Sequence, residues 1–365
     1  MRILIGKIKK EKIEMEFNLD NITRNNIKTL KAYSSARSEF KGKEGVFLDA
    51  NENAFGSPLD VNYNRYPDPL QLELKDKLSK IKGLPIQNIF LGNGSDEAID
   101  LLFRAFCEPG KDNIIICPPT YGMYEVSANI NDVALKKVPL TAETFQLDTE
   151  NIFKAIEPKT KLIFICCPNN PTGNGVKWND IKIIIENFSG IVVIDEAYIN
   201  FAKYRSLIPE LLNYPNLVIL QTLSKAWGLA GLRIGMAFAS EPIIDLFNKI
   251  KPPYNINSVS QKLALDALNN IEKVNNWIKE TVNQRDKLMD DLSKLSYIKK
   301  VYPSDANFFL IKVEEPLSLY NYLIKRKIIV RDRSKVELCE GCLRITVGTI
   351  EENKLVLDAL KDYVL

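Results

Sequence analysis

The sequence predicts an α/β fold: a mostly parallel sheet with helices on both faces, followed by a smaller α+β region at the C-terminal end. Short, continuously apolar runs alternate with helical stretches as far as about residue 255. Strands of this kind are typical of a parallel sheet that is covered on both faces. Beyond residue 255 a long helical stretch precedes further short apolar runs. We therefore expect an arm over residues 1–48, a large domain over 49–255 and a small domain over 256–365.

The composition is that of an ordinary globular protein and excludes several classes of function. Of 365 residues, 45% are hydrophobic and 26% are charged, and the net charge is only +3. This balance provides no basic face for nucleic acid. We find no apolar run long enough to span a membrane and no secretory signal, so we expect no membrane association and a cytoplasmic location.

The chain contains no histidine. This absence excludes Ser-His-Asp and Cys-His nucleophile systems and histidine-based acid–base catalysis. Proton transfer must then fall to lysine, tyrosine, cysteine or a carboxylate. Cys339 and Cys342 have the spacing of half a zinc site, but the sequence offers no second pair to complete it. We therefore expect no metal.

The apolar runs predict the strands and the helices between them. In the large domain we expect strands at 89–91, 114–117, 162–166, 191–194, 217–220 and 234–238. A helical pattern covers 70–81 and stops at Gly83 and Pro85. In the small domain we expect one helical stretch through 263–288 and strands at 308–311, 328–330 and 343–347.

Polar clusters follow five of the predicted strands at their carboxyl ends. They lie at 94–96, 118–122, 168–173, 195–198 and 222–225. In open α/β sheets ligands bind beyond this edge, so the five clusters are expected to converge on one crevice. In the first cluster Ser95 is a candidate N-cap, and a helix start exposes backbone N–H groups to an anion.

The segment from Thr222 to Arg233 carries the chemistry that suggests a cofactor. An amine such as that of Lys225 becomes nucleophilic when burial or a neighbouring positive charge lowers its pKa. The hydroxyls of Thr222 and Ser224 and the guanidinium of Arg233 can hold a dianion. This combination suits a phosphorylated aldehyde, and Lys225 is the candidate Schiff-base lysine for pyridoxal 5'-phosphate. Alternatively, a Ser-Lys pair after a strand is simply a solvated loop.

The other clusters offer partners for a pyridoxal ring. Asp195 ends a very apolar run and can keep a proton on the ring nitrogen, although an aspartate at this position is also a common helix cap. Tyr198 and Asn170 can donate to the phenolic oxygen. Tyr121 can stack on the ring or simply pack in the core.

A phosphate on this ring needs its own donors. The backbone N–H groups of Ser95 and Asp96 are suitably placed, together with Arg233 and the hydroxyls of Thr222 and Ser224. We expect Asp96 to contribute only its backbone, because a carboxylate facing the phosphate would repel it.

The ordered set of motifs resembles the fold-type I pyridoxal-phosphate aminotransferases, and among them the histidinol-phosphate aminotransferases. The resemblance extends from about residue 33 to the C-terminal region, and its motifs lie at 51–56, 64–68, 92–97, 118–124, 168–173, 195–198, 223–235, 330–332 and 341–348. Each motif occurs across part of the superfamily, but their order is specific.

The resemblance implies a role for each matching residue. Lys225, Asp195 and Tyr198 would be catalytic, with Lys225 moving a proton between the substrate carbon and the cofactor. The implied cofactor-binding residues are Tyr66, Gly94, Ser95, Asp96, Tyr121, Asn170, Asp195, Tyr198, Thr222, Ser224, Lys225 and Arg233. Tyr66 would reach the cofactor phosphate of the neighbouring subunit, so a homodimer is implied. Tyr33, Asn170, Arg331 and Arg344 would bind the substrate.

The implied reaction converts L-histidinol phosphate and 2-oxoglutarate to imidazole-acetol phosphate and L-glutamate. Arginine forks accept either carboxylate or phosphate, so Arg331 and Arg344 can serve both half-reactions. For Arg344 alone, a surface ion pair is the simpler reading. Three alternatives remain at this level: a decarboxylase of a phosphorylated amino acid such as threonine phosphate, an aromatic aminotransferase, and a non-catalytic sensor that keeps the cofactor.

Overall fold

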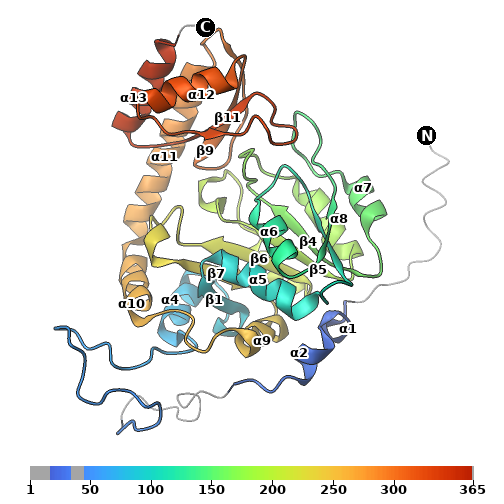
Figure 1. The fold of residues 1–365 in the computed structure, drawn as a ribbon, viewed down its shortest axis with the longest axis vertical. Helices are drawn as coiled ribbons and strands as arrows, with labels where there is room; N and C mark the ends of the chain where they lie inside the picture. Colours follow the sequence, from blue (N-terminus) through green and yellow to red (C-terminus); the bar gives the residue numbers. More distant parts are fainter. Residues whose placement is uncertain (1–16, 34–44, 364–365) are drawn as a thin grey trace.

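A computed structural model describes residues 17–33 and 45–363, with a large sheet, a small sheet and the helices around them (Figure 1). The strands of the large sheet are β1 (Ile89–Asn93), β2 (Asn113–Ile116), β3 (Ala134–Lys137), β4 (Thr160–Cys166), β5 (Ile191–Asp195), β6 (Leu217–Thr222) and β7 (Ile234–Phe238). Their order across the sheet is β1-β7-β6-β5-β4-β2-β3.

The large sheet is mostly parallel, as the apolar runs predict. The pairs β2–β3, β2–β4, β4–β5 and β5–β6 are parallel, whereas β7 is antiparallel to both β6 and β1. The sequence missed β3, because this edge strand is short and two of its four residues, Ala134 and Lys137, are exposed. An edge strand with one partner needs no continuous apolar run.

Successive side chains of the central strands point to opposite faces of the sheet and pack in two separate hydrophobic cores. Ile114 and Ile116 of β2 pack with α5 (Ser95–Phe106), α6 (Met123–Ile130) and α9 (Glu241–Ile250), which share one apolar cluster. Ile115 belongs to the cluster on the other face, which includes residues of α4 (Leu72–Lys82), α7 (Thr149–Ala155), α8 (Trp178–Asn187) and α10 (Ser258–Ala267). Both faces are therefore covered, and the strands must be apolar throughout.

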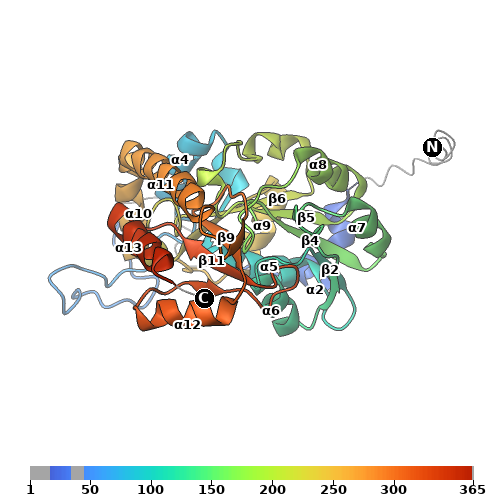
Figure 2. The same cartoon turned by 90° about the horizontal axis from the view of Figure 1, so that it is seen from above.

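The small sheet is antiparallel, with the order β10-β11-β9-β8. Its strands are β8 (Ile298–Val301), β9 (Phe308–Val313), β10 (Arg331–Asp332) and β11 (Cys342–Thr346). The helices α11 (Ile271–Leu292), α12 (Pro316–Lys325) and α13 (Ile350–Lys361) pack on one face of it, and the other face is turned to the large sheet (Figures 1 and 2).

Two predictions for the small region were wrong in detail. The strand expected at 328–330 is not part of the ladder, which begins at Arg331. Lys327, between the end of α12 and this segment, adopts a φ of 61°. The chain therefore turns away from α12 just before residues 328–330. The single helical stretch expected at 263–288 is divided into α10 and α11 by a short 3-10 turn, Leu268–Asn270.

Residues 17–29 of the predicted arm pack on helices of the large sheet. They contain α1 (Leu19–Ile22) and α2 (Asn25–Thr29). The backbone N–H of Arg24 donates to Ala105 O (3.0 Å), and Lys249 Nζ donates to Ile27 O (2.7 Å). Residues 1–16 and 34–44 of the arm lie outside the described residues, and the domain boundary near residue 255 stays a prediction. Within the described ranges, no helix has the length and apolarity of a membrane span.

Candidate active site

A cavity of about 220 Å³ lies at the carboxyl edge of the large sheet. Its walls come from the ends of β4, β5 and β6 and from the segments that follow β1, β2, β4, β5 and β6. The lining residues are Gly94, Ser95, Asp96, Tyr121, Cys166, Asn170, Asp195, Ala197, Tyr198, Thr222, Ser224, Lys225, Ala230 and Arg233. The structure thus brings together every predicted cofactor-binding residue except Tyr66.

The turn from β1 into α5 presents backbone N–H groups to this cavity. Gly94 has a φ of 77°, and a Cβ atom there would lie 2.5 Å from Arg233 Nη2. A Cβ atom on Gly235 would lie 2.0 Å from the backbone nitrogen of Ser95, so β7 can approach the turn only with glycine. Gly94 is the N-cap residue of α5, and no side chain caps this helix end with a hydrogen bond. Ser95 is the first helical residue. The predicted Ser95 N-cap was therefore wrong by one residue, which leaves the first N–H groups free for an anion.

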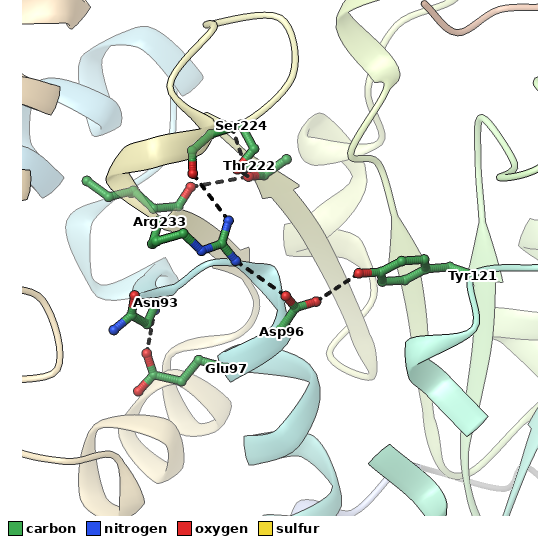
Figure 3. Close-up of polar contacts among 9 residues, drawn as sticks. Asn93, Asp96, Glu97, Tyr121, Thr222, Ser224 and Arg233 are labelled. Atoms are coloured by element: carbon green, nitrogen blue, oxygen red, sulfur yellow. Dashed lines mark hydrogen bonds and ion pairs between the residues drawn. The ribbon is translucent and has the colours of Figure 1, made fainter. Parts of the chain in front are cut away.

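The Asp96 carboxylate joins two cavity residues, a role that the sequence did not predict. Figure 3 shows Asp96 between Arg233 and Tyr121. Its Oδ2 atom lies 3.4 Å from Arg233 Nη2, and its Oδ1 atom accepts a hydrogen bond from Tyr121 Oη (3.1 Å). The side chain of Asp96 thus holds the guanidinium and the tyrosine ring in fixed positions relative to each other.

The hydroxyls of Thr222 and Ser224 lie side by side at the end of β6 (Figure 3). Thr222 Oγ1 and Ser224 Oγ are 2.9 Å apart, and the Ser224 N–H donates to Thr222 Oγ1 (3.0 Å). Two adjacent hydroxyls beside Arg233 and a helix start form a donor set suited to a phosphate dianion.

Lys225 projects into the same cavity between two arginines. Burial lowers the pKa of its amine, and the positive charges of Arg344 and, more weakly, Arg233 lower it further. The carboxylates of Asp195 and Asp96 act in the opposite direction. Its Nζ atom lies 5.7 Å from the centroid of the Tyr198 ring. A lowered pKa increases the fraction of neutral amine, which is the nucleophilic form.

Asp195 ends β5 and is 3% exposed. Burial raises the pKa of its carboxyl, while two hydrogen bonds favour the ionised form. The Tyr124 hydroxyl donates to Oδ2 (2.7 Å), and the N–H of Ala197 donates to Oδ1 (3.0 Å). Tyr124 is fully buried and was not predicted as a site residue. The only hint in the sequence was its position one helical turn after Tyr121.

Asn170 connects the cavity to the small sheet. Its Nδ2 atom donates to Tyr198 Oη (3.4 Å), and its Oδ1 atom accepts from Arg344 Nη1 (2.5 Å). The Arg344 guanidinium also lies 5.0 Å from the centroid of the Phe308 ring, and its buried Nε atom has no hydrogen-bond partner. Arg344 is therefore not the surface ion pair of the simpler reading. It is a half-buried cation directed at a cavity residue.

The remaining predicted substrate residues have different surroundings. Arg331 on β10 pairs directly with Arg344 on β11, so the two side chains share one face of the small sheet. Tyr33 ends the first described stretch, is 75% exposed and does not line the cavity. Its predicted role stays a prediction.

Tyr66 lies outside the cavity, on a second hollow of the surface near 50–67 and 254–259. Its ring stacks on Tyr254, with centroids 4.5 Å apart. The same stretch of the chain carries further exposed apolar side chains: Val46, Leu48, Phe55, Leu59, Val61 and Tyr63. The predicted role of Tyr66 in the site of a neighbouring subunit stays a prediction.

The donor set fits a phosphorylated pyridine aldehyde. A buried, hydrogen-bonded carboxylate suits a protonated ring nitrogen, the amine of Lys225 suits the aldehyde, and the Ser95 turn with Arg233 suits the phosphate. Among residues 17–33 and 45–363 no group of three or more histidine, cysteine or acidic side chains is placed to hold a metal ion.

Comparison with known proteins agrees with this geometry. The model of the family described as aminotransferase class I and II matches residues 48–360. A histidinol-phosphate aminotransferase from Cytophaga hutchinsonii is 56% identical over 349 residues, which cover 96% of this chain and 100% of the relative.

Solved structures share the fold. The histidinol-phosphate aminotransferase from Clostridium acetobutylicum matches with a TM-score of 0.76 and 26% identity, over 82% of this chain and 90% of that chain. The enzyme of that name from Sinorhizobium meliloti, solved in complex with pyridoxal-5'-phosphate, matches with a TM-score of 0.75 at 24% identity, over 85% and 88% of the two chains. At such identity the second match concerns the fold alone. From the full-length sequence match and the family model, the chain belongs to the histidinol-phosphate aminotransferase family within the class I and II aminotransferases.

Proposed function

We propose that this chain is a cytoplasmic, homodimeric transaminase that converts L-histidinol phosphate and 2-oxoglutarate to imidazole-acetol phosphate and L-glutamate, with pyridoxal 5'-phosphate as cofactor. The observation that carries the proposal is the position of Lys225. Its amine lies in one cavity with the buried Asp195 carboxylate, and arginines from two different elements depress its pKa. A cytoplasmic location suits a phosphorylated, charged intermediate that does not cross membranes unaided.

Different cavity residues would contact different parts of the cofactor. When bound, the pyridoxal ring supplies an electron sink for negative charge that develops at the substrate carbon. The hydrogen bonds from Tyr124 and the Ala197 N–H favour the ionised form of Asp195, which would keep the proton on the ring nitrogen. The Ser95 turn, Thr222, Ser224 and Arg233 would hold the phosphate, and Tyr121 would contact the ring face.

Lys225 is the group that moves the reacting proton. Its amine would hold the cofactor through the aldehyde and, when released, would serve as the base at the substrate carbon. The charge of Arg344 disfavours the ammonium form and so increases the fraction of neutral amine that can accept a proton. Tyr198 and Asn170, whose side chains are 3.4 Å apart, would donate to the phenolic oxygen.

The same pair of arginines serves both half-reactions. Histidinol phosphate has a phosphate and no α-carboxylate, whereas glutamate has carboxylates. A guanidinium fork accepts either kind of oxygen pair, so Arg344 and Arg331 can hold each donor in turn. The half-buried Arg344, with its unpartnered Nε atom, supports this assignment.

The exposed segment around Tyr66 supports a homodimer. We infer that Val46, Leu48, Phe55 and their neighbours are buried against a second copy, and that Tyr66 reaches the phosphate in that copy's cavity. The stacking of Tyr66 on Tyr254 and the bond from its N–H to Glu52 Oε1 (2.6 Å) hold the ring in place before association.

Steady-state assays of the purified protein test the proposal. Histidinol phosphate with 2-oxoglutarate should yield glutamate, and phenylalanine in place of histidinol phosphate should react much more slowly. Faster release of carbon dioxide from threonine phosphate than of glutamate from histidinol phosphate would refute transamination in favour of decarboxylation. A similar rate with phenylalanine would indicate an aromatic aminotransferase.

A further inference from the structure

A third arginine, Arg333, extends the Arg331–Arg344 pair. The ladder between β10 and β11 pairs Arg331 with Arg344 and Asp332 with Leu343. It continues one step further, because the Arg333 N–H donates to Cys342 O (2.9 Å). Side chains alternate along a strand, so Arg331, Arg333 and Arg344 project from the same face of the small sheet.

This face is the one turned toward the large sheet. Cys342 and Leu310 also project from it, and both belong to the apolar cluster that contains Ile163 of β4. The intervening residues Leu343 and Ile345 pack on the opposite face with residues of α11, α12 and α13. The three arginines therefore project from the inner face, where Arg344 reaches Asn170, Arg333 is partly buried and Arg331 is exposed.

The positive charge on this face is only partly balanced, because the Asp332 carboxylate near Arg333 favours its charged form without forming a salt bridge with it. Within 17–33 and 45–363, none of the three arginines forms an ion pair, and the Nε atoms of Arg333 and Arg344 are buried without a partner. The nearby Asp332 carboxylate accepts hydrogen bonds from the N–H and Oγ of Ser334 (2.8 and 2.6 Å).

Placing these arginines close together and partly burying them is electrostatically unfavourable. Burial lowers the pKa of Arg333, and the charges of Arg344 and Arg331 lower it further. Burial also lowers the pKa of Arg344. Partly buried like charges that stay unpaired are unfavourable for the protein alone, and such clusters are found where an anionic ligand compensates them.

We propose that Arg333 is a specificity-determining residue: with Arg331 and Arg344 it favours the doubly charged phosphate end of one amino donor over the singly charged carboxylate end of the other. One guanidinium fork suffices for a carboxylate, whereas a dianion gains from each added positive charge. The inference rests on the proposed function, because that function assigns the anionic end of the substrate to Arg331 and Arg344.

The test compares both amino donors in Arg333→Gln. The KM for histidinol phosphate should rise about tenfold, which is a loss of about 1.4 kcal/mol, with kcat nearly unchanged. The KM for glutamate should rise by no more than about twofold. Lys335→Gln is the matched control: it removes the same charge two residues away from an exposed side chain and should change neither KM. Equal increases for both donors, or no increase for either, would overturn the proposal.

A second variant covers the case in which Arg333→Gln does not fold. Arg333→Lys keeps the charge but loses the fork, so we expect a smaller increase of about threefold, again confined to histidinol phosphate. An increase shared by glutamate would show a merely structural role. Circular dichroism and cofactor content of each variant identify loss of fold.

Inorganic phosphate separates failure of this inference from failure of the proposed function. If the protein does not transaminate histidinol phosphate, the proposed function fails. Competition of phosphate with glutamate then still tests the arginine face. Weaker inhibition by phosphate in Arg333→Gln, but not in Lys335→Gln, supports a role for Arg333 in dianion binding. Equal inhibition in both variants contradicts it.

Discussion

The hydroxyl of Tyr124 donates a 2.7 Å hydrogen bond to Oδ2 of Asp195, and both side chains are buried. The Tyr124 ring is held by a stack on Phe164, with centroids 4.7 Å apart, and by an edge contact with Tyr121 at 5.6 Å. The carboxylate that meets the ring nitrogen is thus positioned by a residue on α6. That residue also contacts the tyrosine proposed to stack on the ring.

Loss of this hydroxyl should weaken catalysis without disturbing the fold. In Tyr124→Phe the pKa of Asp195 rises, because one of the two donors that favour its ionised form is removed. A less ionised carboxyl holds the ring proton less well, so we expect kcat to fall about tenfold and cofactor affinity to decrease. Steady-state kinetics and cofactor titration measure both effects.

The control for this variant is Tyr214→Phe. Tyr214 donates a hydrogen bond to Glu186 at 3.3 Å, far from the cavity residues, so its removal tests the general effect of losing a phenol hydroxyl. Unchanged kcat in Tyr124→Phe, or an equal loss in both variants, would show that the bond to Asp195 has no catalytic role.

The pH dependence of cofactor capture should report the charge of Arg344. Capture requires neutral Lys225, so its rate increases as the pH rises through the pKa of this amine. Because the Arg344 charge lowers that pKa, Arg344→Gln should raise it and move the rise in rate to higher pH. Stopped-flow absorbance of apoprotein mixed with pyridoxal 5'-phosphate measures the profile. A profile that stays in place, or that moves to lower pH, would show that Arg344 does not tune the amine.

The sequence predicted the central strands well because burial on both faces demands continuous apolar runs. It failed at the margins. The edge strand β3 carries Lys136 and Lys137, and the start of β10 depends on the turn at Lys327. Neither feature is determined by local hydrophobicity. Strand pairing and the turn that precedes it decide where these ladders begin.

The site was predictable to the extent that one rule brings separate segments together. The carboxyl ends of β1, β4, β5 and β6 meet at one edge, so polar residues there had to converge. The contacts of Tyr124 with Asp195 and of Asp96 with Arg233 were missed. Both join residues that are distant in the sequence, and their partners can be identified only from side-chain geometry. The arginine face of the small sheet likewise depends on the ladder register.

The buried amine of Lys75 should lower the stability of the folded protein. Lys75 is 4% exposed, and burial lowers its pKa from 10.5 to about 8. The unfolded chain therefore binds this proton more tightly than the folded protein does. Stability should rise as the pH increases from about 8 toward 10.5, and below about 8 the full cost remains.

Lys75→Met removes that cost while keeping a long apolar stem. We expect the free energy of unfolding at neutral pH to increase by about 1–3 kcal/mol, and the gain to shrink as the pH approaches 10.5. Urea unfolding at fixed protein and cofactor concentration measures it. Lys80→Met, which removes an exposed ion pair with Asp76, should change stability by less than about 0.5 kcal/mol. A destabilised Lys75→Met at neutral pH would contradict the assignment.

Hybrid dimers test whether Tyr66 acts in the neighbouring subunit. Lys225→Ala alone should be inactive, and Tyr66→Ala alone should bind the cofactor weakly and turn over slowly. In a hybrid of the two, the cavity that keeps Lys225 receives Tyr66 from the other subunit and is complete. Random re-association of equal amounts should therefore recover about a quarter of wild-type activity, since half of the dimers are hybrids with one complete site each. If Tyr66 served its own cavity, neither site of the hybrid would be complete and mixing would recover nothing.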